Sequence, residues 1–164
     1  MLPDWLSPPL EISGANIEET YQKLYEVYLK IVSELDTIVV DGKHVVFDRN
    51  PDAVMPQFEG AFMHFVTRGA GSVRVYDEAR ASKIHWIVPL LKHYEDEDVK
   101  SFWCQGPKVN TLYIWLEEYN YVLILKDMKS AKFSETRMVV TAFSVDSDYR
   151  KSLRKKYQRA KKIL

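Results

Sequence analysis

Residues 111–126 read TLYIWLEEYNYVLILK, and this stretch decides the fold class. Two apolar runs flank the polar residues EEYN at 117–120, which is the pattern of two strands joined by a β-hairpin turn. Further along, RMVVTAFSV at 137–145 is rich in β-branched and aromatic residues, which favour strands. The sequence therefore predicts a three-stranded antiparallel meander in the C-terminal half of the chain.

A strong helical pattern opens the N-terminal half. Residues 16–37 carry apolar side chains at intervals of three and four, and Asn16 with Glu19 matches a capping box at the helix start. Two β-branched runs then flank an Asp-Gly pair at 41–42, which is a typical turn of a two-stranded hairpin. The sequence therefore predicts a helix followed by a hairpin before the meander begins.

Two shorter helical stretches lie between the hairpins. Residues 56–68 and 75–94 have helical patterns, and GAG at 69–71 separates them. Together with the meander, this order predicts an α+β fold with an antiparallel sheet. We expect residues 1–15, which hold three prolines, to form an extended arm, and residues 16–164 to form a single domain.

The last stretch, 146–164, is strongly basic. Eight lysines and arginines against two aspartates give it a formal charge of +6, so the first 145 residues carry −6 in a chain of zero net charge. We expect a C-terminal helix over 148–162, with one apolar side packed on the domain. Its cations, Lys155 and Lys156 among them, can bind an RNA backbone. They can equally form a solvated face that suits the helix dipole, and both interpretations stay open.

The bulk composition limits the class of protein. With 164 residues, 46% of them apolar, the chain is long enough for one domain with a core. Cys104 is the one cysteine, which excludes an internal disulfide and fits a reducing compartment. No apolar run approaches the ~20 residues that cross a bilayer, and MLPDWLSPPLEIS lacks the pattern of a signal peptide. We expect a cytoplasmic protein that does not bind membranes.

Common catalytic and cofactor motifs are missing from the sequence. The four histidines show no metal-ligand spacing. The chain also has no nucleophile elbow, Walker loop or dinucleotide fingerprint. We therefore expect no metal and no cofactor.

Several residues could handle a phosphate group. In FEGAFMHFVTRG, His64 stands among apolar neighbours, where a partly buried imidazole suits proton transfer near neutral pH. A core histidine bonded to a backbone carbonyl is an equal alternative. Arg68 and Arg80 could bind phosphate through their forked donors. Thr141 could offer its hydroxyl to phosphate, although packing within a strand is the stronger interpretation. Tyr113 could stack on a base or belong to the core.

Six segments occur in an order that resembles one ribonuclease family. They are GAFMHFVTRG, EARASKIHWIVPLL, VKSFW, TLYIWLEEYNYVLIL, VVTAF and YRKSLRKKYQ. Across roughly residues 38–160, the chain resembles the phage-associated branch of the barnase–EndoU–colicin–RelE (BECR) superfamily. The resemblance implies N-terminal helices packed on a curved antiparallel sheet. It also implies metal-independent RNA cleavage, in which the 2′-hydroxyl attacks the adjacent phosphate.

The same resemblance implies roles for single residues. His64 would be the general acid or base, Arg80 would contact the phosphate and Thr141 would orient it. A second acid–base residue is not obvious, and His85 and Tyr113 are the candidates. We expect the remaining substrate contacts from Arg68, His85, Tyr113, Lys155 and Lys156.

The sequence thus predicts a metal-independent endoribonuclease, toxin-like or phage-related, whose partners are RNA and a protein inhibitor or antitoxin. Two alternatives stay open. One is a catalytically inactive relative that binds nucleic acid or a protein, and the other is an antitoxin-like partner protein, which the acidic first 145 residues permit. Convergence of His64, Arg80 and Thr141 around one cleft would favour the ribonuclease.

Overall fold

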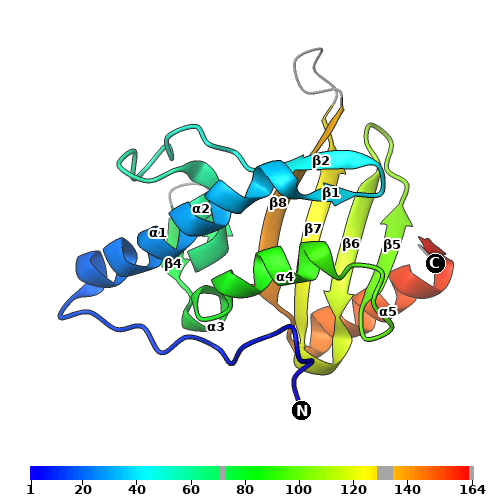
Figure 1. Ribbon diagram of the computed structural model, residues 1–164, viewed down its shortest axis with the longest axis horizontal. Helices are drawn as coiled ribbons and strands as arrows, with labels where there is room; N and C mark the ends of the chain where they lie inside the picture. The colour runs from blue at the N-terminus through cyan, green and yellow to red at the C-terminus, as the bar shows by residue number, and fades with distance from the viewer. Residues whose placement is uncertain (71–72, 129–134, 163–164) are drawn as a thin grey trace.

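A curled seven-stranded sheet forms the centre of the computed structural model, which describes residues 1–70, 73–128 and 135–162 (Figure 1). The strand order is β1-β2-β8-β7-β6-β5-β9. A separate two-stranded sheet pairs β3 with β4. The strands are β1 (Val39–Val40), β2 (Lys43–Val46), β3 (Thr67–Ala70), β4 (Val73–Tyr76), β5 (Lys100–Cys104), β6 (Thr111–Leu116), β7 (Tyr121–Asp127), β8 (Thr136–Ser144) and β9 (Lys161–Lys162).

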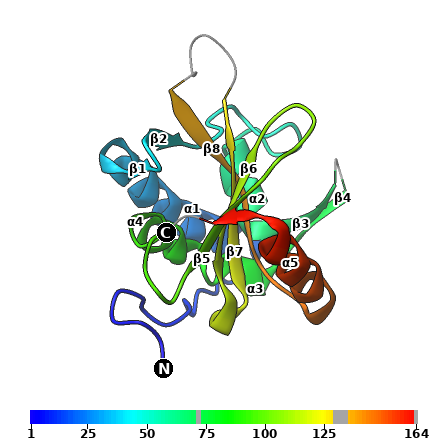
Figure 2. The same cartoon turned by 90° about the vertical axis from the view of Figure 1, so that its right-hand side faces the viewer.

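Helices lie on both sides of this sheet, so the fold class is α+β, as predicted. The helices are α1 (Ile17–Glu34), α2 (Gly60–Val66), α3 (Glu78–Ala81), α4 (Ile87–Lys92) and α5 (Ser147–Arg159), with 3-10 turns at Leu35–Thr37, Ile84–Trp86 and Glu117–Tyr119. Figure 2 shows α1 and α4 on one side of the sheet and α5 on the other. None of the helices in the described ranges has the length and apolar character needed to cross a membrane.

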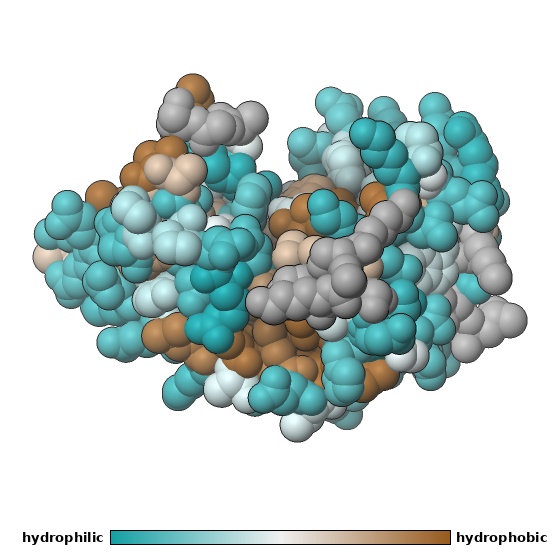
Figure 3. Space-filling model, turned by 90° about the horizontal axis from the view of Figure 1, so that it is seen from above, coloured by the Kyte–Doolittle hydropathy of each residue, from teal (hydrophilic) through white to brown (hydrophobic). Residues whose placement is uncertain are grey.

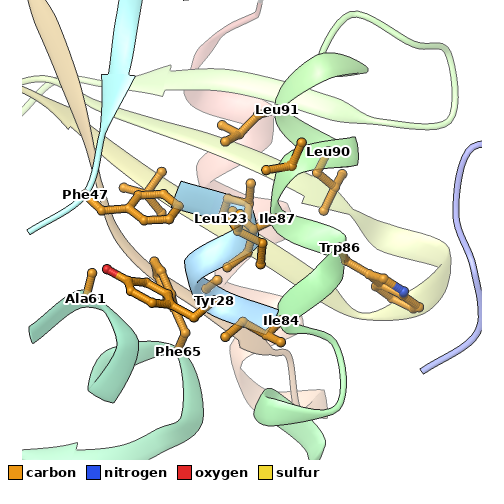
Figure 4. Close-up of a cluster of buried hydrophobic side chains, with 14 of the residues drawn as sticks. Tyr28, Phe47, Ala61, Phe65, Ile84, Trp86, Ile87, Leu90, Leu91 and Leu123 are labelled. Carbon is orange, nitrogen blue, oxygen red and sulfur yellow. The ribbon is translucent and has the colours of Figure 1, made fainter. Parts of the chain in front are cut away.

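The main core fills the space between the sheet and the N-terminal helices. Tyr28 of α1, Phe65 of α2 and Leu123 of β7 are all fully buried there (Figure 4). A smaller apolar cluster on the opposite face holds α5, because Leu153 packs against Phe102 and other residues of the sheet. The two clusters leave the strands of the central meander buried on both faces.

The meander predicted from residues 111–126 and 137–145 is confirmed. β6 and β7 pair antiparallel from Thr111↔Lys126 to Leu116↔Tyr121, and Asn120 closes the turn with a φ of 52°. β8 pairs antiparallel with β7, with a register shift between Ile124 and Leu125. Such a bulge bends the strand and increases its twist, which helps the sheet to curl.

The prediction that the whole sheet is antiparallel is wrong. β1 and β2 do form the hairpin predicted at 41–42, with φ of 46° at Asp41 and 86° at Gly42. However, β2 pairs with β8 in parallel, from His44↔Thr136 to Val46↔Met138. A parallel pair joins segments that are far apart in sequence, and local patterns carry no signal for it.

Three further boundaries differ from the prediction. The helix expected over 56–68 ends at Val66, because Thr67–Ala70 forms β3. β3 pairs with Val73–Tyr76, which were predicted partly helical, and Gly69 takes a φ of 111° that favours glycine. Residue 71 of the GAG segment lies outside the described residues. β5 was missed, and Lys161 and Lys162 pair with β5 instead of extending α5.

The N-terminal arm is attached to the helical side of the domain. Residues 1–15 form no helix or strand. The indole Nε1 of Trp86 donates to the carbonyl of Ser7 at 2.8 Å, and the Leu10 N–H donates to the Ser82 carbonyl at 2.7 Å. Trp5 stacks on His93 with ring centroids 4.4 Å apart. These contacts hold the arm along η2 (Ile84–Trp86) and α4.

One buried arginine links three parts of the curled sheet. Arg137 of β8 is 5% exposed, and its Nε donates to Asp127 of β7 at 2.7 Å. Its Nη1 donates to the carbonyls of Val40 and Asp41 in the β1–β2 hairpin. Its guanidinium also lies 4.8 Å from the ring centre of Trp103 in β5. The charge is therefore paired, hydrogen-bonded and stacked, as a buried charge requires.

We predict that Arg137→Met strongly destabilises the protein. The substitution keeps the aliphatic part of the side chain but leaves two carbonyls without their donor and Asp127 with only its longer pair to Lys43. Breaking a buried pair in this way costs about 3–5 kcal/mol. Urea unfolding of the variant measures the loss. Lys126→Ala, at an exposed position of the neighbouring β7, is the control and should change the free energy of unfolding by no more than about 0.5 kcal/mol. Equal stability of both variants would contradict the role given to Arg137.

Candidate functional site

A hollow lies on the α5 side of the sheet. Seen from above, it opens between the lobe that holds the β3–β4 hairpin and the lobe that holds α5 (Figure 3). Thr141, Ile124 and Tyr113 are Cα partners across β8, β7 and β6, so their side chains point to the same face. Phe143 follows Thr141 on that face, and Ile124, Tyr113 and Phe143 all belong to the apolar cluster under α5. We call this surface the groove face.

Three arginines lie at one side of the groove face. Arg68 is on β3, Arg74 on β4 and Arg80 on α3. The Arg80 guanidinium packs over the Phe143 ring at 5.3 Å from its centre, so this group adjoins the groove face directly. We call Arg68, Arg74 and Arg80 the arginine bank.

Two guanidinium groups of this bank meet on one carbonyl oxygen. Arg80 Nη1 donates to the Thr67 carbonyl at 2.6 Å, and Arg74 Nη2 donates to the same oxygen at 2.9 Å. Arg74 Nε also donates to the Thr67 hydroxyl at 2.8 Å. The carboxylate of Asp77 approaches Arg80 Nε only at 4.0 Å. The two positive charges are therefore fixed side by side with little neutralisation, which is the electrostatic character of an anion-binding surface.

His64 lies beside these arginines. It is the exposed residue of α2, whose other residues are buried. Its backbone carbonyl accepts a hydrogen bond from Arg80 Nη1 at 2.9 Å. Partial burial of the ring and the nearby charge of Arg74 hold the pKa of His64 below its ordinary value. The imidazole is therefore neutral near pH 7, which is the form that accepts a proton.

Thr141 brings a hydroxyl to the same side of the molecule. It is half-buried in β8, and both α2 and α3 pack against this strand. Among the described residues, no hydrogen bond engages its hydroxyl. Phe143, two residues later on the same face, touches Arg80. Arg80 thus contacts the His64 carbonyl and the ring of Phe143, two residues from Thr141, whereas no hydrogen bond joins Thr141 to either His64 or Arg80 among the described residues.

The basic helix α5 borders the opposite side of the groove face. Arg150 and Arg154 are tied to the turn between β6 and β7, because Arg150 Nη1 donates to the Glu117 carbonyl at 3.1 Å and Arg154 pairs with its carboxylate at 3.2 Å. Lys156 instead reaches the groove face. Lys155 is exposed and has no partner among the described residues. Arg150 and Arg154 therefore stabilise the fold, whereas the charge of Lys155 is free to bind a ligand.

Tyr113 lies in the groove face, but its ring is not free to stack on a base. The ring is 8% exposed and stacks on Phe102 with centroids 5.1 Å apart. Its hydroxyl accepts a hydrogen bond from Lys156 Nζ at 3.2 Å. The neighbouring Tyr149 has its pKa raised to about 12, mainly by burial and further by Tyr113. The Tyr149 hydroxyl therefore stays protonated near neutral pH.

His85, predicted as a substrate contact and a candidate acid–base residue, is not brought to the groove face. Its Nε2 lies 2.9 Å from the Pro8 carbonyl in the N-terminal arm. It also lines a hollow with Trp5 and His93. Burial lowers its pKa, so it is neutral near pH 7. Its position indicates that it fixes the arm.

Arg74 is the main site residue that sequence reasoning missed. Residues 73–76 read VRVY, an alternation that indicates a strand with one polar side. Because a helix was predicted from residue 75 onward, residues 73–76 were not recognised as a strand, and Arg74 was not placed beside His64. The cross-strand pair Gly69↔Arg74 now sets its position.

In the described ranges, no three residues among the histidines, cysteines, aspartates and glutamates lie close enough together to hold a metal ion. Comparison with known proteins gives no match: no protein family, no curated protein and no solved structure is significantly similar to this chain.

We predict that the pKa of His64 lies below the ordinary value of about 6.5 and rises in the variant Arg74→Gln. Removing Arg74 takes away the largest nearby positive charge, while Arg80 still lowers the pKa and Asp52 and Asp48 still raise it. Titration of the ring protons by NMR measures both values.

Arg68→Gln is the matched control, because Arg68 does not contribute to the shift of His64. It removes one arginine of the same bank and should move the pKa less than Arg74→Gln does. An unchanged pKa in Arg74→Gln would show that the two groups are not coupled.

Proposed function

We propose that this chain binds RNA on the groove face and cleaves it without a metal ion, with His64 as the general base. The observation that carries the proposal is the arginine bank itself. Two guanidinium groups share the Thr67 carbonyl at 2.6 and 2.9 Å, beside a histidine held neutral and next to the partly buried groove face. The negative charge of a phosphodiester would pair with these guanidinium groups.

The roles follow from the chemistry of each group. Neutral His64 takes the proton of the 2′-hydroxyl, whose oxygen then attacks the adjacent phosphorus. Arg80 and Arg68 offer cationic donors to the phosphorane, whose charge is larger than that of the ground state. Thr141 donates its hydroxyl to a non-bridging oxygen. The bond to the 5′ oxygen breaks, and a water molecule gives the leaving oxygen its proton.

The charges on α5 support a long substrate. Lys155 is exposed, and Lys156 lies 5.2 Å from the Tyr113 ring centre at the far side of the groove face. Cations on both sides of one surface can follow a strand that crosses it. RNA, rather than a small phosphate ester, is therefore the substrate that we propose.

The second candidate is an RNA-binding protein that does not cleave. The observation that favours it is the position of His85, which contacts the N-terminal arm and so supplies no second acid–base residue. The cytoplasmic, toxin-like or phage-related setting and a protein inhibitor or antitoxin rest on the family resemblance alone and remain part of the proposal.

We predict that the purified protein cleaves single-stranded RNA in the presence of EDTA. His64→Ala should lower the rate by about 100- to 10,000-fold, the usual loss for a positioned acid or base. Thr141→Val keeps the shape of the side chain and should lower the rate by about tenfold or more, because it removes one hydrogen bond to a charged group. Gel electrophoresis of a labelled RNA measures all three.

His44→Ala is the matched control, since His44 is an exposed histidine on β2, and it should cleave at the rate of the unsubstituted protein. A rate for His64→Ala equal to that of His44→Ala would show that His64 is not the base. RNA binding without cleavage by the unsubstituted protein would favour the second candidate.

A further inference from the structure

A second hollow lies beyond the groove face, at the end of α5. It has a volume of about 770 Å³ and is lined by Trp103, Gln105, Asn110, Arg137, Lys156 and Arg159, among others. The residues come from β5, the loop after it, β8 and the last turn of α5. Lys156 belongs to both places, because it also contacts the Tyr113 hydroxyl on the groove face. The hollow therefore adjoins the groove face at Lys156, while Trp103 and Arg137 line it from the main-core side of the sheet.

The charge of this hollow favours an anion. Its lining holds three cations, Arg137, Lys156 and Arg159, and one carboxylate, Asp127. Asp127 is already paired with Arg137 at 2.7 Å and with Lys43 at 3.6 Å. Within the described part of the chain, nothing pairs with the Arg159 guanidinium. The uncompensated positive charge thus lies on Lys156 and Arg159.

The helix dipole offers an alternative explanation for the positions of Lys156 and Arg159. Both lie in the last turn of α5, where positive side chains offset the partial negative charge of the free carbonyls. That interaction explains charge at the helix end. It does not explain why the same hollow also carries two exposed amide side chains with no hydrogen-bond partner in the described ranges, those of Gln105 and Asn110.

Binding of an anion does not require the two amide side chains, but binding of a nucleotide base would use them. Each carboxamide has one acceptor and two donors, which is the set that reads the edge of an unpaired base. The indole of Trp103 adds an aromatic wall, fixed by its hydrogen bond to Asp41 at 3.1 Å and by Arg137. Cationic, amide and aromatic groups therefore surround one space.

We propose that this hollow binds one nucleotide of an RNA strand, with its phosphate on Lys156 and Arg159 and its base against Asn110, Gln105 and Trp103. The site deepens the proposed function and rests on its claim that RNA lies on the groove face. Because binding of a nucleotide does not require cleavage, the two proposals can fail separately.

The test is an NMR titration of the ¹⁵N-labelled protein with adenosine or cytidine 5′-monophosphate and, separately, with inorganic phosphate. The chain has four tryptophans and so four indole N–H signals, and Trp103→Phe identifies the one from Trp103. We expect nucleotides to shift the Trp103 signal and to leave those of Trp5 and Trp86 in place. A shift of equal size with phosphate alone, or no shift of Trp103, overturns the proposal.

Two variants locate the binding groups. Arg159→Gln and Asn110→Ala should each weaken nucleotide binding, Arg159→Gln by about tenfold or more because it removes a charge-assisted hydrogen bond. Lys151→Gln is the matched control, since Lys151 is exposed on the same helix but does not line the hollow. If Arg159→Gln lowers the melting temperature and leaves the affinity unchanged, the charge serves the helix dipole and the proposal is wrong.

A further experiment asks whether the hollow binds a nucleotide within an RNA strand or a free mononucleotide. It uses a short RNA whose 2′-hydroxyls are methylated, so that it cannot be cleaved. As part of a strand that also contacts the groove face, it should bind more tightly than the mononucleotide. Tighter binding of the mononucleotide would indicate a site for free nucleotides and would overturn the proposal. His64 does not line the hollow, so a loss of cleavage by His64→Ala without a loss of mononucleotide binding affects only the proposed function.

Discussion

The RNA-binding face that we propose depends on the meeting of two guanidinium groups at the carbonyl oxygen of Thr67. Arg74 approaches it from β4 and Arg80 from α3, so one oxygen joins the β3–β4 hairpin, α2 and α3. Asp77 pairs with Arg80 Nε at 4.0 Å, and the negative charge of Asp52 acts on Arg74. Burial lowers the pKa of both groups. The fold thus uses backbone oxygens to hold both positive charges in place beside the groove face.

A series of side-chain contacts connects Arg80 to the other residues of the proposed site on the opposite side of the groove face. Arg80 packs on Phe143, and Phe143 meets Tyr149 of α5 with ring centroids 5.1 Å apart. Lys156, about two turns further along α5, reaches the Tyr113 hydroxyl. A row of rings therefore connects the arginine bank to the basic helix, and the polar groups along it lie where a single strand of RNA could make contact with all of them.

Local patterns in the sequence predicted the local parts of this structure. The hairpin at 111–126, the cap at Asn16 and the Asp-Gly turn all depend on residues within a few positions of each other. Pairings between distant segments were not predictable in this way. The parallel pairing of β2 with β8 and the contact of His85 with Pro8 carry no local signal. His64, Arg80 and Thr141 were grouped by resemblance, whereas Arg74 needed the strand pairing at Gly69.

The most direct test of the account is to map where RNA binds. A single-stranded RNA with methylated 2′-hydroxyls stays intact, and its effect on the backbone and arginine Nε–H signals can be followed by NMR. The account predicts shifts at Arg80, Thr141 and Lys156 on the groove face, and none at Trp5 or His85 near the N-terminal arm. Shifts confined to the arm, or no shifts at concentrations that saturate other RNA-binding proteins, would contradict it.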